Sequence, residues 1–124
     1  MKRKRPIIVK GITIKRYVGC GTIYITINYD EHGPVEVFIQ LGKAGGCIAA
    51  LLSVISKMIS LALRNEASLE EVLSYVEGIV CPRDVEGLEG CPKAIAYAIK
   101  KYLALKPELK GEEKCLILDH HNGQ

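Results

Sequence analysis

The sequence lacks the long apolar segments that place a protein in a membrane or direct it to secretion. No apolar run approaches the roughly 18–20 residues of a membrane-spanning helix. The basic residues 2–5 resemble the start of a signal peptide, but only three apolar residues follow Pro6 before Lys10 interrupts them. We therefore expect a cytoplasmic protein without a membrane partner.

Two thermolabile residue types are also scarce, since glutamine occurs twice and asparagine three times, whereas isoleucine, lysine and glutamate are abundant. That bias is typical of proteins from thermophiles. A composition of 48% hydrophobic and 25% charged residues excludes disorder and low complexity. At 124 residues, the chain is long enough for one domain with a core and too short for two ordinary domains.

The positive charge is concentrated at the start of the chain. Lysine and arginine number 17 against 14 acidic residues, a net charge of +3. Four of these cations lie together in a basic N-terminal arm over residues 1–6: Lys2, Arg3, Lys4 and Arg5. The arm either contacts a phosphate backbone or simply keeps a nearly neutral body soluble.

Three segments in the first third of the chain have the period of two that is typical of half-buried strands. These are residues 12–17, 23–28 and 35–41, joined by glycine-containing turns at residues 19–21 and 30–34. Short connections favour neighbouring antiparallel strands. We therefore predict a three-stranded antiparallel meander.

After residue 46 the period changes to 3.6, which indicates helices. We predict a helix over residues 47–65, a second that opens with the capping box at residues 68–71 and ends at Gly78, and a third from Cys91 that stops before Pro107. The first helix is apolar except for one narrow stripe, so we expect it to be the central core element; the stripe is Ser53, Ser56, Lys57, Ser60 and Arg64.

The fold class that follows is α+β, a three-stranded antiparallel meander sheet covered on one face by three helices. We assign residues 7–105 to this single domain and residues 106–124 to a polar C-terminal tail. Cys115 and the His120-His121 pair lie in that tail. We interpret them as parts of a frayed end, with a metal or redox role as the alternative.

Five cysteines, an odd number, in a chain without a secretory signal disfavour a disulfide scaffold and favour metal binding or redox chemistry. Four of them stand at element ends, and the alternating direction of strands and helices brings all four to one end of the domain; they are Cys20, Cys47, Cys81 and Cys91. Four convergent thiolates are the ligand set of a structural zinc site. Buried small hydrophobic side chains and two disulfides remain open as alternatives.

Two further segments are candidate anion sites. The turn over residues 42–46 joins a strand to a helix N-terminus, where Lys43 and the backbone of Gly45 and Gly46 favour an anion, although the spacing is not that of a P-loop. An ordinary tight turn is the alternative. On the outer face of the sheet we expect aromatic side chains beside a cation, as in single-strand nucleic-acid binding: Tyr17, Tyr24, Phe38 and Lys15. Packing against another part of the chain or a dimer partner is the alternative there.

No catalytic constellation stands out, because the sequence has no Ser-His-Asp spacing and no histidine in a structured element. We therefore do not expect an enzyme.

Five blocks of the sequence, in order, resemble the TSCPD domain family over roughly residues 5–104. The blocks are residues 19–21 (GCG), 24–28 (YITIN), 36–47 (EVFIQLGKAGGC), 59–64 (ISLALR) and 78–82 (GIVCP). The motif that names the family is reduced to Cys91-Pro92. The resemblance implies a module found at the C-terminus of cobalamin-dependent ribonucleotide reductases and as short independent proteins. It also implies that the four cysteines stand where family members carry them, but it implies no catalysis by this chain.

Three functions are consistent with these observations. The first is a non-catalytic, zinc-stabilised binding module for a polyanion, either nucleic acid or nucleotide. The second is an accessory subunit that acts on the large chain of a ribonucleotide reductase. The third is a small homodimeric scaffold with the aromatic sheet face as its interface.

Overall fold

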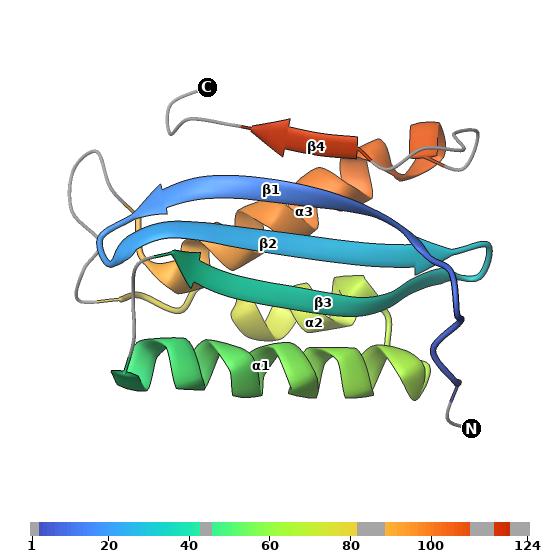
Figure 1. Ribbon diagram of the computed structural model, residues 1–124, viewed down its shortest axis with the longest axis horizontal. Helices are drawn as coiled ribbons and strands as arrows, with labels where there is room; N and C mark the ends of the chain where they lie inside the picture. The colour runs from blue at the N-terminus through green and yellow to red at the C-terminus, as the bar shows by residue number, and fades with distance from the viewer. Residues whose placement is uncertain (1–2, 43–45, 82–88, 110–115, 120–124) are drawn as a thin grey trace.

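The computed structural model of the chain describes residues 3–42, 46–81, 89–109 and 116–119 (Figure 1). Its elements, in chain order, are β1 Lys10–Val18, β2 Gly21–Asp30, β3 Gly33–Gly42, α1 Gly46–Arg64, α2 Leu69–Val76, α3 Cys91–Leu109 and β4 Leu116–Asp119. β1 pairs antiparallel with β2, and β2 with β3. The meander packed against three helices is the α+β fold that the sequence predicts.

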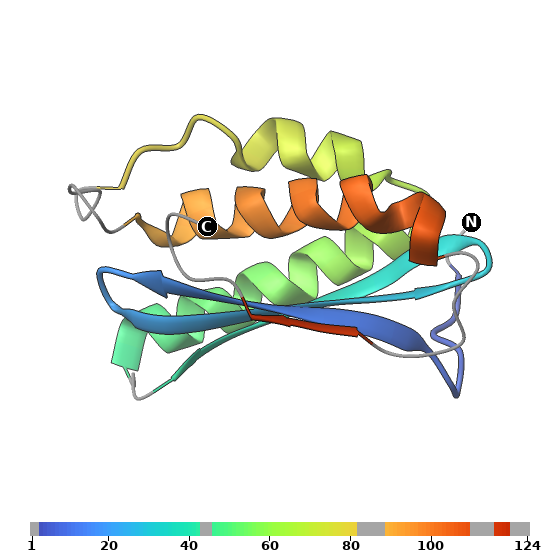
Figure 2. The ribbon, with the colours of Figure 1, turned by 90° about the horizontal axis from the view of Figure 1, so that it is seen from above.

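Alternation along the strands sends the aliphatic side chains to one face of the sheet, where the core lies. β2 shows this most clearly, because Ile23, Ile25 and Ile27 are fully buried while the residues between them are not. Helix α3 covers this face, and α2 lies beside it (Figure 2). The α3 side chains that complete the core are Ala94, Ile95, Ala98, Ile99 and Tyr102.

Helix α2 begins where the capping box predicts. The Ser68 hydroxyl accepts a hydrogen bond from the Glu71 N–H at 3.0 Å, and the Glu71 carboxylate accepts one from the Ser68 N–H at 3.4 Å. The predicted end of α3 is wrong by a few residues, since the helix continues through Pro107 to Leu109. Pro107 lies in the last turn of α3, where its missing N–H removes one backbone hydrogen bond, so the helix ends soon after it.

The predicted position of α1 is also wrong. Instead of filling the centre of the core, α1 runs along β3 at the edge of the sheet (Figure 1). Only a narrow set of its side chains is buried, namely Leu52, Ser56, Ile59, Ser60 and Leu63. Its apolar composition is therefore not explained by contacts within the described part of the chain.

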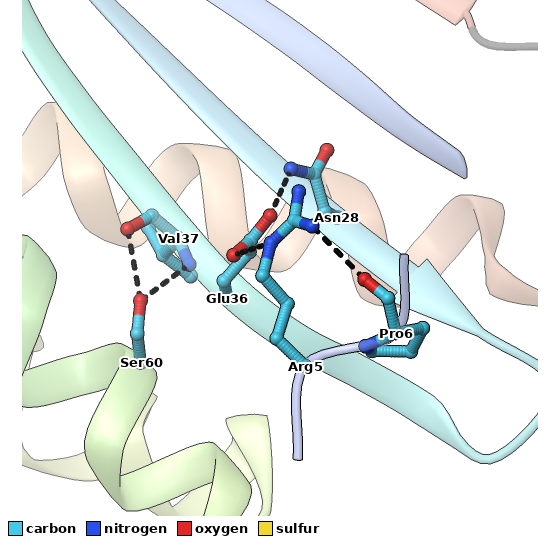
Figure 3. Close-up of polar contacts among 6 residues, drawn as sticks. All are labelled: Arg5, Pro6, Asn28, Glu36, Val37 and Ser60. Carbon is cyan, nitrogen blue, oxygen red and sulfur yellow. Dashed lines mark hydrogen bonds and ion pairs between the residues drawn. The ribbon is translucent and has the colours of Figure 1, made fainter. Parts of the chain in front are cut away.

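Two serines attach α1 to the open edge of β3. The Ser60 hydroxyl accepts a hydrogen bond from the Val37 N–H at 3.0 Å and donates one to the Val37 carbonyl at 3.2 Å (Figure 3). The Ser56 hydroxyl accepts one from the Ile39 N–H at 2.8 Å. The helix thus satisfies backbone groups that an edge strand otherwise leaves to water or to another strand.

β4 corrects the interpretation of residues 106–124 as a polar tail. It pairs in parallel with β1, with Ile12 opposite Leu116 and Lys15 opposite Asp119, so the strand order is β3-β2-β1-β4. The sheet therefore has a fourth strand, on the edge opposite to α1. Cys115, His120 and His121 lie outside the described residues.

α1 is long and apolar enough to cross a membrane when judged by length and composition alone. By that measure the expectation that no segment of the chain approaches a span is wrong. The core helix of a soluble protein can meet the same criterion.

Candidate metal centre and ligand groove

The element ends that carry the cysteines lie at one end of the domain. The β1–β2 turn, the start of α1, the start of α3 and the segment that follows α2 are at the same end in both views (Figures 1 and 2). The alternating chain direction predicted this convergence. Cys20, Cys81 and Cys91 are partly buried there, Cys47 is exposed, and all four have free thiols.

A short parallel contact brings Cys20 and Cys91 together. Val18 forms an isolated parallel bridge with Glu89, and the Gly19 N–H donates a hydrogen bond to the Glu89 carbonyl at 3.2 Å. Each cysteine stands two residues beyond a member of that bridge. The two chain segments therefore deliver the two thiols to the same place.

A buried ion pair holds this contact in register. The Arg16 guanidinium donates two hydrogen bonds to the Glu89 carboxylate, at 2.9 and 3.0 Å, in the bidentate arrangement that gives the strongest pairing. The same guanidinium lies over the Tyr97 ring, 3.9 Å from its centroid. Arg16 is 6% exposed, so these contacts replace the water that its charge loses on folding.

Two of the partly buried thiols, Cys20 and Cys81, act on the third, Cys91. Burial raises the pKa of the Cys91 thiol, and negative charge on Cys20 and Cys81, together with a hydrogen bond to Cys20, raises it further. Thiolates that are brought together in this way repel one another unless a cation lies between them. The cluster has the donor chemistry that zinc prefers.

Cys47 is the most exposed of the four predicted ligands and has the weakest connection to the other thiols. It lies exposed in the first turn of α1, and it is not among the groups that shift the Cys91 thiol. Within the described ranges, no group of three or more histidine, cysteine or acidic side chains is arranged to hold a metal ion as it stands.

Lys43 and Gly45, predicted as an anion site, lie outside those ranges, and Gly46 is the exposed first residue of α1 with a φ of 72°.

The outer face of the sheet carries the predicted aromatic side chains. Tyr24 is 37% exposed and Phe38 is 47% exposed, and both belong to the outward set of their strands. Register places Lys15 opposite Tyr24 on β1, and the Lys15 ammonium lies 5.5 Å from the centroid of the Tyr17 ring. These four side chains therefore form one patch on that face.

Part of the basic arm is bound to the domain. The Arg5 Nε donates to the Glu36 carboxylate at 2.8 Å, and the Asn28 amide donates to the other oxygen of that carboxylate at 2.6 Å (Figure 3). Burial raises the pKa of Glu36, but these hydrogen bonds and the charges of Arg5 and Arg64 outweigh it and hold the pKa below its usual value. The arm thus covers one end of the outer face.

Arg3 is engaged in a similar way. Its N–H donates to the Arg64 carbonyl, and its guanidinium contacts the Pro34 carbonyl at 3.1 Å and the Asp30 carboxylate at 3.7 Å. Lys4 is exposed, and Lys2 lies outside the described residues. Two of the four predicted arm cations are therefore already paired with acids of the same chain.

A groove of about 700 Å³ runs between α1 and β3 beside the open part of the sheet. Tyr24, Phe38 and Gln40 line it from the sheet, and Ser53, Lys57 and Arg64 line it from the helix. The contacts of Ser60 with Val37 and of Ser56 with Ile39 set the relative register of helix and strand. The polar stripe of α1 therefore faces a strand that presents an exposed aromatic ring.

Cations outnumber anions around this groove. Lys57 is exposed, and the Arg64 Nε is buried without a hydrogen-bond partner within the described part of the chain. Glu36 is the acidic residue of the lining, and its charge is already shared with Arg5. A negatively charged ligand is thus favoured in the groove over a positive one.

Sequence reasoning did not assign Ser53, Lys57 and Arg64 to a site. They were visible as the narrow polar stripe on an otherwise apolar helix. The stripe alone does not say what it faces, because that depends on the docking of α1 against β3.

These features define the class of the protein: a small α+β domain with a thiol cluster at one end of its sheet and a cation-lined groove along one edge. The chain belongs to the TSCPD domain family, whose sequence profile matches residues 1–103. That match confirms the resemblance drawn from the five sequence blocks. No curated protein and no solved structure matches the chain significantly.

Proposed function

We propose that this TSCPD domain is a non-catalytic binding module that holds a polyanion, a nucleotide or a nucleic acid, in the groove between α1 and β3. The observation that carries the proposal is the exposed Phe38 ring beside a groove that Lys57 and Arg64 make positive. An aromatic face accepts any nucleobase by stacking, and nearby cations bind the phosphates. The basic arm contributes less than its sequence suggests, because Arg3 and Arg5 are already paired.

The experiment is a fluorescence anisotropy titration with a labelled oligothymidylate of about a dozen nucleotides and with a fluorescent ATP analogue, each at several salt concentrations. We expect salt-sensitive binding of at least one probe. The Lys57→Gln variant weakens it and reduces the magnitude of the salt slope by about 0.7 for the single-stranded probe, the effect of losing one phosphate contact.

Matched controls separate the groove from general charge. Lys100→Gln removes one positive charge from an exposed helix position on α3 and leaves binding unchanged, apart from the small effect of net charge. Phe38→Ala weakens binding by about 1–3 kcal/mol of stacking free energy, whereas Tyr75→Ala on α2 does not. Absence of salt-sensitive binding to both probes contradicts the proposal.

Zinc at the cysteine cluster is the second part of the proposal. Cys20, Cys81 and Cys91 would hold the ion, and the exposed Cys47 is the one of the four predicted ligands that the geometry supports least. Bound zinc supplies structural cross-linking of the β1–β2 turn to the start of α3. The Arg16–Glu89 pair supports this role, because it aligns the two chain segments that carry Cys20 and Cys91.

Metal content is measured by elemental analysis and native mass spectrometry on protein purified without added metal. We expect one zinc per chain, lost in Cys20→Ser and retained in Cys115→Ser, which lies outside the family match. Metal-free protein with five free thiols, unchanged after incubation with zinc, leaves the cysteines as core side chains.

A second candidate function is that of an accessory subunit of a ribonucleotide reductase. Membership of the TSCPD family favours it, since the resemblance connects this module with the cobalamin-dependent enzymes. It predicts co-purification with a large reductase chain and a change in the activity of that chain. No association at micromolar concentrations of both proteins removes it.

A further inference from the structure

Many of the exposed large apolar side chains in the described part of the chain lie on the outward side of α1. Leu51 is 58% exposed, Met58 is 61% exposed and Val54 is 51% exposed. Burying a large aliphatic side chain that is left in water is worth roughly 1.5–3 kcal/mol. Several such side chains exposed on one helix are therefore unfavourable in a monomer, and their burial would stabilise an assembly.

The spacing of these side chains is that of a helix–helix seam. Exposed residues follow one another at intervals of four, three, four and three along α1, in the order Cys47, Leu51, Val54, Met58 and Leu61. That alternation is the heptad pattern with which one helix packs along another. Ile48 and Ile55, also exposed, flank the seam.

The seam lies on the opposite side of α1 from the sheet. At 100° per residue, the seam side chains centre about 150–180° from the Leu52, Ser56 and Ile59 side chains that face β3. α1 is thus apolar on two sides, with the groove-lining stripe along a third. The fourth strand lies at the other edge of the sheet and leaves this side of α1 uncovered.

We infer that the seam of α1 is the interface with a second copy of this chain, joined through an antiparallel pair of α1 helices about a two-fold axis. The heptad spacing is the one with which a helix packs along another helix, and the described part of the chain holds no second exposed helix face with this pattern. A second α1 offers the same spacing. A two-fold axis makes the two surfaces self-complementary.

The direction of the pair follows from charge. α1 carries the cations Lys57 and Arg64 and no acidic side chain. A parallel pair sets each of these cations level with its own copy and aligns the helix dipoles, whereas an antiparallel pair separates the cations and opposes the dipoles. The groove lies beside the seam, so it stays accessible in this arrangement.

The available area is close to what an interface needs. The seam and its two flanking isoleucines expose on the order of 500 Å², which is at the upper end for the largest patch of a monomer. A standard interface covers roughly 800 Å² per partner, including a polar rim around its apolar centre. The seam therefore forms the apolar centre of such an interface.

The oligomeric state of the full chain tests the inference. By sedimentation equilibrium and native mass spectrometry at micromolar concentration, we expect the wild type to have the mass of two chains. Met58→Glu raises the dissociation constant at least about thirtyfold, because it places a carboxylate from each copy in the interface. Met58 is exposed in the monomer, so circular dichroism of this variant should match the wild type.

Two matched controls locate the interface. Tyr75→Glu, at an 80% exposed position on α2, leaves the dimer intact. Phe38→Asp also leaves it intact, which distinguishes the seam from the aromatic sheet face that the sequence suggested as an interface. Dissociation by Phe38→Asp, with the Met58→Glu variant still dimeric, overturns the inference.

A cross-linking experiment tests the antiparallel direction. In a Cys47→Ser background, Val54→Cys lies near the two-fold axis and a short bis-maleimide joins it to its own copy. Leu61→Cys lies seven residues from Val54 along the helix. At a rise of 1.5 Å per residue, the two copies of this cysteine in an antiparallel pair are about 20 Å apart along the helix axis, so the reagent does not join them. Cross-linking of both variants indicates a parallel pair and contradicts the inferred direction.

A wild-type monomer overturns the inference. If that monomer floats with phosphatidylcholine vesicles and Met58→Glu does not, the occupant of the seam is a lipid surface. If the wild type is a monomer and also does not float with the vesicles, the seam binds neither a second copy nor a lipid surface.

Discussion

Tyr102 shows how one buried hydroxyl links the core to pH. It is 2% exposed, and its ring centroid lies 5.8 Å from that of Tyr29. Its pKa is raised to about 12, mainly by burial and to a smaller extent by negative charge on Tyr29, Asp30 and Glu70. A raised pKa means that the neutral form is the one the folded state favours. Its contribution to stability is complete below the ordinary pKa of tyrosine, near 10, and is lost as the pH rises toward 12.

We therefore predict that the free energy of unfolding falls by about 2–3 kcal/mol between pH 10 and pH 12 because of this one group. Urea titrations of the wild type and of Tyr102→Phe across that range measure the difference. The variant, which has no hydroxyl to ionise, should fall less steeply. Parallel curves for the two proteins contradict the prediction.

The Arg16–Glu89 pair joins the chain segments that carry Cys20 and Cys91. Glu89→Gln leaves a buried guanidinium without its counter-charge, and we predict a loss of about 3 kcal/mol in the free energy of unfolding. Glu77→Gln, which breaks an exposed pair with Lys100, should cost under about 1 kcal/mol. Thermal and urea denaturation of both variants make the comparison, and equal losses would show that burial of the pair is unimportant.

At the scale of elements, the joint between α1 and β3 depends on matched periods. Four residues of helix rise about 6 Å and two residues of strand rise about 6.8 Å, so serines four apart meet alternate residues of β3. Ser56 meets Ile39 and Ser60 meets Val37 in this way. The polar stripe is therefore both the anchor of the helix and one wall of the groove.

Ser56→Ala tests this joint. It leaves the Ile39 N–H buried and unpaired, and we predict a cost of about 1–3 kcal/mol in the free energy of unfolding. Ser53→Ala is the control from the same helix, because Ser53 is exposed and its replacement should change stability by under about 0.5 kcal/mol. The result is read by urea denaturation, and a harmless Ser56→Ala would mean that water replaces the hydroxyl at the strand edge.

The sequence pattern of α1 was sufficient to predict a helix and insufficient to place it. Periodicity reports which residues are apolar, and here they surround the helix on all sides except the stripe. Burial inside the domain and burial against a partner produce the same pattern in a sequence. The exposed Leu51 and Met58 distinguish the two cases only once β3 and α3 are in position.

At the scale of the whole molecule, β4 extends the sheet beyond the region that matches the family. The match covers residues 1–103, whereas β4 begins at Leu116. We predict that a chain ending at Leu109 still folds, because the described core residues all lie in residues 12–102. Amide protons of β1 should then exchange faster, since β1 becomes an edge strand.

Hydrogen–deuterium exchange with mass spectrometry on the two chain lengths checks this. The comparison is internal, because β2 keeps both of its neighbours and its amides should keep their protection. Loss of cooperative unfolding in the shorter chain would show that β4 is required for the fold rather than added to it.

Local features of the sequence determined most of the secondary structure. Alternating isoleucines specify β2, the Ser68–Glu71 box starts α2, and short turns make the meander antiparallel. The chain direction that follows also brings the cysteine-bearing ends of these elements together. Each of these conclusions depends on residues close together in the chain.

Only the tertiary structure decided the features that depend on distant residues. These are the bridge between Val18 and Glu89 that aligns two thiols, the docking of α1 on the edge of β3, and the pairing of β4 with β1. An edge strand offers the same backbone groups to any neighbour, so its own sequence does not specify which element will pair with it. For this reason the groove and the exposed seam of α1 emerge from packing, although every side chain in them was visible in the sequence.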